Sequence, residues 1–187
     1  MIISKGNDKL GKIPNISLPP LITCDKLPCN KKCYALKCYH RSIESRNAWK
    51  TNLMHYESDA TDYFQEINKY LERKQVDFFR FHVSGDIPDQ NYLNGMKYVA
   101  KHNPATKFLV FTKKYYLNFS FIPRNLQVVF SVWPGVKLPK KPFPRAYVQD
   151  GTETRVNNAV ECAGYCHNCF MCWNLSEIGK NVVFKIH

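Results

Sequence analysis

The chain has 187 residues and a formal net charge of +12, with 44% hydrophobic and 14% aromatic residues. This composition is typical of a globular protein and excludes a low-complexity chain. No window approaches the roughly 20 apolar residues of a membrane span, and residues 1–12 lack the apolar run of a secretory signal. We expect one cytoplasmic domain over residues 1–187, large enough to bury a core.

The basic charge favours an anionic partner such as nucleic acid, and a solvated basic surface is the alternative. A set of aromatic and basic side chains from two segments would suit a nucleic-acid surface. An ordinary solvated rim would use the same residues, which are Tyr115, Tyr116, Lys113, Lys114, Lys140 and Lys141.

Apolar periodicity predicts secondary structure along the whole chain. It indicates strands over 13–18, 77–83, 108–112, 126–132, 145–149 and 181–186, and helices over 40–56, 61–73 and 89–102. Ser58 or Asp59 is the expected cap of the second helix, and Asp89 that of the third. The segment 115–121 is expected to be a short helix or irregular.

Strands that alternate with helices predict an α/β fold with a parallel sheet. Nearly continuous apolar runs indicate a sheet covered on both faces. We therefore expect a partial (β/α) barrel or an open parallel sheet of about five to six strands, with two cysteine-rich metal-binding loops. In either architecture ligands bind at the carboxyl ends of the strands, where Cys24 and the Ser84-Gly85-Asp86 turn would meet.

All eight cysteines lie in two loops, at 24–38 and 162–172. Cysteines that serve only as core residues would be dispersed, and a cytoplasmic protein keeps its thiols reduced. Clustered thiols in that compartment favour metal binding, with disulfides as the weaker alternative for this even number.

The second loop supplies four thiolates, from Cys162, Cys166, Cys169 and Cys172. Four thiolates suit Zn²⁺ or an iron–sulfur cluster. The C-x2-C-x2-C core is closer to a ferredoxin-type sequence than to a zinc ribbon, which favours [4Fe–4S] over zinc. His167 is expected beside the site or in solvent, since four cysteines already complete it.

The first loop places Cys24, Cys29 and Cys33 in the loop itself, and Cys38 further on, where a helix is expected to begin. Three ligands would leave one iron open to a substrate or cofactor, whereas four would close the site. As an alternative to ligation, Cys38 would be a core thiol of that helix.

The Ser84-Gly85-Asp86 turn is the candidate cofactor-binding segment. Gly85 would let the backbone approach a ligand, and the flanking side chains would hydrogen-bond it. The alternative is an ordinary strand-to-helix turn. His82 is expected to be a core histidine.

The motifs KGNDKLGKIPNISLPPLITC, CYALK, RFHVSGD and the late CxxCxxCW together resemble the phage and mobile-element gene product 88 family. The resemblance covers most of the chain and implies a location in the host cytoplasm.

The order of strand, cysteine loop, helix, strand and glycine turn also resembles a shortened radical-SAM barrel. That resemblance implies a [4Fe–4S] cluster on Cys24, Cys29 and Cys33, and S-adenosylmethionine beside Ser84, Gly85 and Asp86. The late cysteines would then hold an auxiliary cluster.

These observations lead to one main hypothesis, an iron–sulfur protein that is a SAM-dependent or redox enzyme. A zinc-stabilised nucleic-acid-binding protein and a small electron-transfer protein with two closed clusters are the alternatives.

Overall fold

The structure is a computed structural model that describes residues 1–133, 135–149 and 158–185. It contains, in chain order, β1 (Asn15–Ile16), the 3-10 helix η1 (Pro28–Lys32), α1 (Tyr34–Arg41), α2 (Ile43–Ser58), α3 (Ala60–Lys74), β2 (Phe78–Phe81), α4 (Gln90–His102), β3 (Lys107–Thr112), β4 (Leu126–Ser131), β5 (Arg145–Gln149), β6 (Ala159–Glu161), α5 (Cys166–Cys169), the 3-10 helix η2 (Met171–Asn174) and β7 (Asn181–Lys185). Among these elements, no helix is long and apolar enough to cross a membrane.

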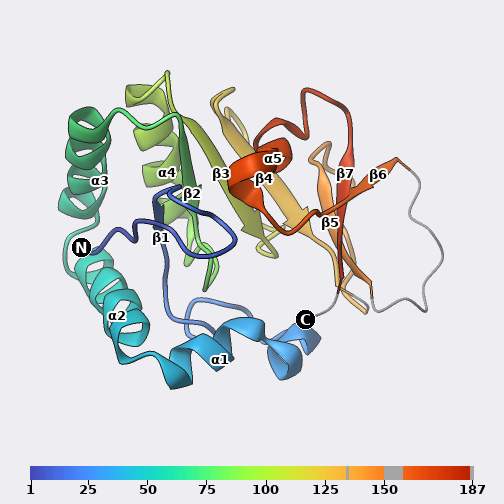
Figure 1. Cartoon of the computed structure of the whole chain (residues 1–187), viewed down its shortest axis with the longest axis horizontal. Helices are drawn as coiled ribbons and strands as arrows, with labels where there is room; N and C mark the ends of the chain where they lie inside the picture. Colours follow the sequence, from blue (N-terminus) through green and yellow to red (C-terminus); the bar gives the residue numbers. More distant parts are fainter. Residues whose placement is uncertain (134, 150–157, 186–187) are drawn as a thin grey trace.

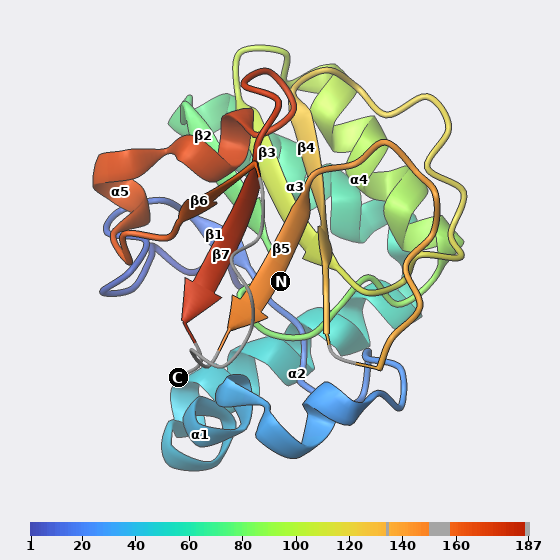
Figure 2. The ribbon, with the colours of Figure 1, turned by 90° about the vertical axis from the view of Figure 1, so that its right-hand side faces the viewer.

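The strands form one open, seven-stranded sheet in the order β1-β2-β3-β4-β5-β7-β6. Every neighbouring pair of these strands is parallel. The carboxyl ends of the strands therefore meet at one edge, and in Figure 2 the arrows of β5 and β7 run toward α1 and α2. The predicted parallel α/β fold is confirmed in its open form, and the ends of the sheet are not joined into a barrel.

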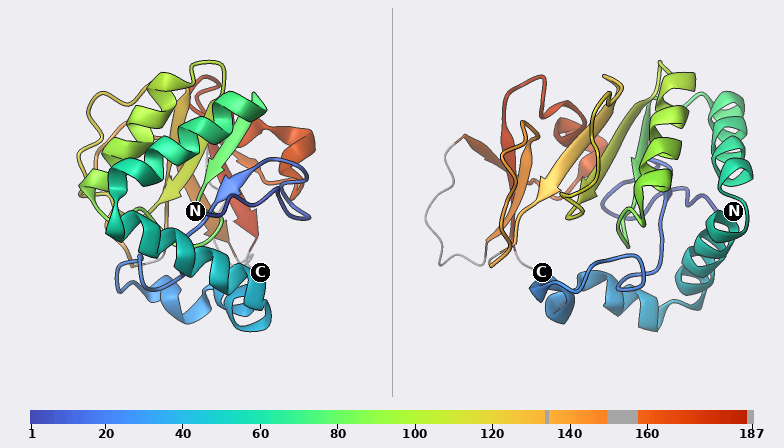
Figure 3. Two further views of the ribbon diagram at one scale, coloured as in Figure 1. Left: turned by 90° about the vertical axis from the view of Figure 1, so that its left-hand side faces the viewer. Right: turned by 180° about the vertical axis from the view of Figure 1, so that it is seen from behind.

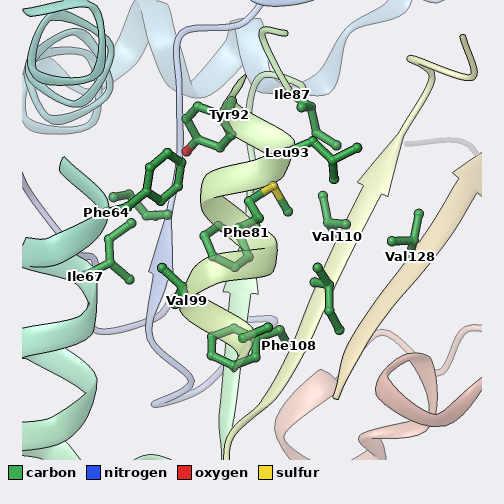
Figure 4. Packing of buried hydrophobic residues seen from close by; sticks show 14 of the residues in the cluster. Phe64, Ile67, Phe81, Ile87, Tyr92, Leu93, Val99, Phe108, Val110 and Val128 are labelled. Carbon is green, nitrogen blue, oxygen red and sulfur yellow. The ribbon is translucent and has the colours of Figure 1, made fainter. Parts of the chain in front are cut away.

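Both faces of the sheet are covered, as the apolar strands predict (Figure 1). On one face, α3 and α4 pack against residues such as Phe81, Phe108 and Val110, and Figure 4 shows part of this cluster. On the other face, Leu109 and Val129 pack with Trp173 from η2. Consecutive strand residues therefore serve opposite clusters, which follows from the two-residue repeat of a strand.

The three long helices α2, α3 and α4 begin at side-chain caps, whereas α1 and α5 have none. Ser42, Asp59 and Asp89 each accept a hydrogen bond from a backbone N–H in the first turn of α2, α3 and α4. The expectation of caps at Asp59 and Asp89 is confirmed. The prediction of a helix over 40–56 is wrong at its start, because Ser42 ends one helix and caps the next.

The strand count and two strand bounds also differ from expectation. The sheet has seven strands because a three-residue β6 pairs with β7, and a strand this short gives no clear periodicity. The strand predicted over 13–18 contains only Asn15–Ile16, and the strand predicted over 77–83 ends at Phe81. The segment 115–121 contains turns and no helix, and Ile186 of the last predicted strand lies outside the described residues.

The N-terminal arm, residues 1–12, connects distant parts of the fold (Figure 3). Its start pairs with α2, where Asn52 exchanges hydrogen bonds with the backbone of Ile2. Further on, the carbonyl of Lys9 accepts a hydrogen bond of 2.8 Å from the amide of Cys166, and Leu10 is fully buried beside η2. The arm thus joins the β1 side of the sheet to the second cysteine loop.

Candidate functional site

A cavity of about 550 Å³ lies at the carboxyl edge of the sheet. Small-molecule sites usually have volumes of about 300–1,000 Å³. Cys24, Cys29 and Cys33 line this cavity together with the Ser84-Gly85-Asp86 turn. Cys38 is exposed on α1 and does not line it. The two segments predicted to meet at this edge do meet there.

The first cysteine loop is held against the end of β2 by hydrogen bonds. The Thr23 hydroxyl donates to the carbonyl of Pro19 at 3.2 Å and accepts from the amide of Asp86 at 3.0 Å. Just after Cys33, the hydroxyl of Tyr34 donates to the carbonyl of Val83. The thiols are therefore positioned by contacts on both sides of the loop.

The close contact between the cysteine loop and the turn after β2 explains why residue 85 is a glycine. Its φ is +78°, and an added Cβ would lie 2.7 Å from Thr23 Oγ1 and 2.9 Å from the Leu18 carbonyl oxygen. Only glycine fits this conformation and this approach without strain. The close approach is to the cysteine loop, whereas the sequence suggested an approach to a ligand.

Asp86 is buried, and its carboxylate oxygens accept hydrogen bonds from other groups of the protein. It accepts from the Thr112 hydroxyl at 2.6 Å, from the Lys113 amide at 2.9 Å and from its neighbour Ile87 at 2.8 Å. Burial raises the pKa of this carboxyl, while those three hydrogen bonds act in the opposite direction. Asp86 therefore ties the turn to the end of β3.

Ser84 and His82 are buried cavity residues with free polar atoms. Among the described residues, neither Ser84 Oγ nor His82 Nδ1 has a hydrogen-bond partner, although each residue is only 3% exposed. The other ring nitrogen of His82 lies 3.1 Å from the hydroxyl of Tyr92. Burial lowers the pKa of His82 to about 3, with the charge of Arg80 adding to the effect. The expectation of a buried histidine is confirmed, and its ring also reaches the cavity.

All eight cysteines are free thiols, so the structure contains none of the disulfides that an even count allows. Burial raises the pKa of Cys24 to about 11, helped by the charge of Asp86, and burial also raises the pKa of Cys29. A metal ion bound there would have to displace the thiol protons.

The four late cysteines line a second, small cavity of about 20 Å³. Burial raises the pKa of Cys172 to about 12, and the charges of Cys166 and Cys162 add to it. Burial also raises the pKa of Cys166. The four thiols of the second loop thus share one cavity, and their role as metal ligands stays a prediction. His167 lies within the loop, in α5, and its Nδ1 lies 3.4 Å from the carbonyl oxygen of Lys9 in the arm.

Within the described ranges, no group of three or more His, Cys, Asp or Glu side chains is arranged to hold a metal ion. The thiols of each loop share a cavity, but a bound metal would have to draw them closer together. The donor set is consistent with a thiolate-bound metal.

The proposed aromatic and basic surface is largely engaged within the protein. Lys114 is buried and pairs with Asp25 at 2.7 Å. Lys141 donates to the carbonyls of Tyr115 and Leu117, both at 2.9 Å. Tyr116 remains exposed, and Lys113 lines the cavity.

Sequence reasoning missed Arg80, Lys9 and the aromatic residues Phe111 and Phe184, all of which line the cavity. A signal for Arg80 was present, because residues 80, 82 and 84 are polar at every second position of an otherwise apolar segment. Lys9 and Phe184 are too far apart in sequence for any local pattern to join them.

The fold and site together define an open parallel α/β protein with a cysteine-lined cavity at the carboxyl edge of its sheet. The family model described as gene product 88 matches residues 1–157, so the chain belongs to this phage gene-product family. No curated protein and no solved structure matches the chain. The comparisons therefore add no support to the radical-SAM resemblance.

Proposed function

We propose that this chain is an iron–sulfur protein in which Cys24, Cys29 and Cys33 hold a [4Fe–4S] cluster against the cavity. The observation that carries the proposal is that these three thiols line the same cavity of about 550 Å³ as the Ser84-Gly85-Asp86 turn, whereas Cys38 does not. Three thiolates on a four-iron cluster leave one iron free for a ligand in the cavity.

The open position and the cavity favour an enzyme over a closed electron-transfer protein. In the radical-SAM enzymes that the loop resembles, such a cluster binds S-adenosylmethionine and supplies the electron that cleaves it. The chain's own contribution would be to fix the loop through Thr23 and to offer Ser84 Oγ, a buried hydroxyl with no partner among the described residues, to a bound molecule.

For the second loop we propose a single metal ion bound by Cys162, Cys166, Cys169 and Cys172. A cavity that admits one water has about 10–15 Å³, so the volume of about 20 Å³ suits one ion better than an eight-atom cluster. Zn²⁺ is the ion that four thiolates most often bind in a structural site. This choice departs from the spacing, which favours a cluster.

Metal and acid-labile sulfide analysis of protein purified without oxygen tests both assignments. We expect about four iron and four sulfide with about one zinc per chain, and iron-dependent binding of S-adenosylmethionine in equilibrium dialysis. About eight iron per chain would instead indicate that the second loop also holds a cluster.

Zinc without iron or sulfide would overturn the cluster. It would favour the zinc-stabilised nucleic-acid-binding protein, for which the net charge of +12 speaks. Binding of that kind would weaken steeply as salt rises.

A further inference from the structure

The cavity has a surplus of positive charge. Three acidic residues line it, but Asp25 pairs with Lys114 and Asp86 is occupied by its own hydrogen bonds. Within the part of the chain that the structure describes, none of the cavity's cationic side chains forms an ion pair. These side chains are Lys9, Lys32, Arg80, Lys113 and Lys185.

Two of these cations lie over aromatic rings that touch each other. Arg80 Cζ is 5.0 Å from the centre of the Phe111 ring, and Lys9 Nζ is 4.8 Å from that of Phe184. The two ring centres are 5.7 Å apart and the rings meet edge to face at 72°. The rings attract these two cations, and neither cation has a carboxylate partner among the described residues. These four residues, which we name the cationic wall, come from β2, β3, β7 and the N-terminal arm.

Two buried polar atoms, one in β2 and one in the turn that follows it, point to a missing hydrogen-bond acceptor. Arg80 Nε and Ser84 Oγ are both buried and have no partner among the described residues, and both residues line the cavity. Buried donors without a partner are rare in native proteins, because the hydrogen bonds that such a group made to water are lost on folding and not replaced. An anion in the cavity would satisfy both donors.

We infer that the cavity binds a phosphate-bearing ligand with a planar ring, of the nucleoside phosphate class. The phosphate would accept hydrogen bonds from Arg80 and Ser84 and balance the charge of Lys9, because guanidinium groups match phosphate oxygens well. The rings of Phe111 and Phe184 offer an apolar surface for the base. This inference names a ligand class for the cavity of the proposed function, but it rests on residues other than the cysteines.

Isothermal titration calorimetry of the anaerobically purified full chain tests the inference with the four common nucleoside monophosphates and the matching nucleosides. We expect at least one monophosphate to bind at least tenfold more tightly than its nucleoside. Arg80→Gln should weaken that binding about ten- to a hundredfold, since hydrogen bonds to charged groups are worth about 1.5–3 kcal/mol. Lys9→Gln should weaken it in the same direction and provides a second variant if Arg80→Gln fails to fold.

The matched control is Arg73→Gln, because Arg73 is exposed on α3 and outside the cavity. It should leave binding unchanged. A 5′-phosphorylated trinucleotide distinguishes the end of a strand from a free nucleotide, and Arg80-dependent binding of either supports the inference. Equal affinity for phosphate and nucleoside, absence of binding by all probes, or equal effects of Arg80→Gln and Arg73→Gln would overturn it. Iron content measured on each variant shows whether a change in ligand binding comes from the substitution itself or from loss of the cluster.

Discussion

Gly85 lies where the cysteine loop and the end of β2 come closest. Replacing it with alanine would strain a φ of +78° and place a methyl group 2.7 Å from Thr23 Oγ1. A non-glycine residue in a sparsely populated backbone region costs about 1–3 kcal/mol, and overpacking costs about the same again.

We therefore expect Gly85→Ala to lower the free energy of unfolding in urea by about 2–6 kcal/mol. Gly179→Ala is the matched control, because Gly179 also has a positive φ of +61° but nothing lies within 4 Å of its added Cβ. Equal losses in the two variants would show that the loop contact does not constrain Gly85.

The buried His82 makes the stability of the folded protein depend on pH. Its pKa is about 3 in the folded chain because burial disfavours the charged ring, and about 6.5 when unfolded. The contribution of the neutral ring to the free energy of unfolding is therefore complete above pH 6.5. It is lost as the pH falls from 6.5 toward 3. The expected loss is about 1.4 kcal/mol per pH unit in this window.

Urea unfolding of the wild type and of His82→Asn between pH 7.5 and pH 4 measures this contribution. The difference in the free energy of unfolding between the wild type and His82→Asn should shrink as the pH falls. His102→Asn, which changes an exposed residue, should show the same pH dependence as the wild type. Parallel curves for the wild type and His82→Asn would mean that His82 does not carry the effect.

At the scale of elements, α3 and α4 pack closely where Gly95 faces Phe64. A Cβ added at Gly95 would lie 2.0 Å from Phe64 Cε2, although alanine favours a helix by about 1 kcal/mol over glycine. The clash should dominate, since overpacking costs about 1–3 kcal/mol.

We expect Gly95→Ala to lower the melting temperature, and Phe64→Leu in the same chain to recover part of the loss. The two changes should therefore be non-additive in a double-mutant cycle of unfolding free energies. Additive effects would mean that the two side chains do not meet.

The elements that the sequence predicts best are those with a strong period. The stripe of α3 and the cap at Asp59 give its bounds within one residue, and β5 is predicted at its full extent. Predictions fail where the signal is local and weak, as at Ser42, which divides one apolar pattern into two helices. The three-residue β6 is defined by pairing with β7 and not by its own pattern.

The candidate site likewise has one part that the sequence predicts and one part that only the folded chain brings together. The meeting of Cys24 with Ser84-Gly85-Asp86 is predictable, because parallel strands end at one edge. The cationic wall is not predictable, since Lys9 and Phe184 lie at opposite ends of the sequence and meet only in the folded chain, where the arm contacts the second cysteine loop.

At the scale of the whole molecule, the N-terminal arm secures the second cysteine loop. Leu10 is fully buried in the cluster that contains Trp173 and Leu175. Leu10→Ala should lower the free energy of unfolding by about 2–5 kcal/mol, the usual cost of removing a buried leucine.

Leu21→Ala provides the control, because Leu21 is 39% exposed. Hydrogen exchange of the Cys166 amide, which donates to Lys9, should also speed up in Leu10→Ala and remain slow in Leu21→Ala. Unchanged protection of that amide would show that the arm does not hold the loop.

In our proposal, three cysteines of the first loop, and not four, hold a cluster that faces the cavity. Iron and sulfide content of Cys29→Ser and Cys38→Ser, each purified without oxygen beside the wild type, tests it most directly. We predict that Cys38→Ser retains the iron and sulfide of the wild type, whereas Cys29→Ser loses about four of each. Loss of the cluster from both variants would mean a closed four-cysteine site, and no difference between Cys29→Ser and the wild type would contradict a cluster on this loop.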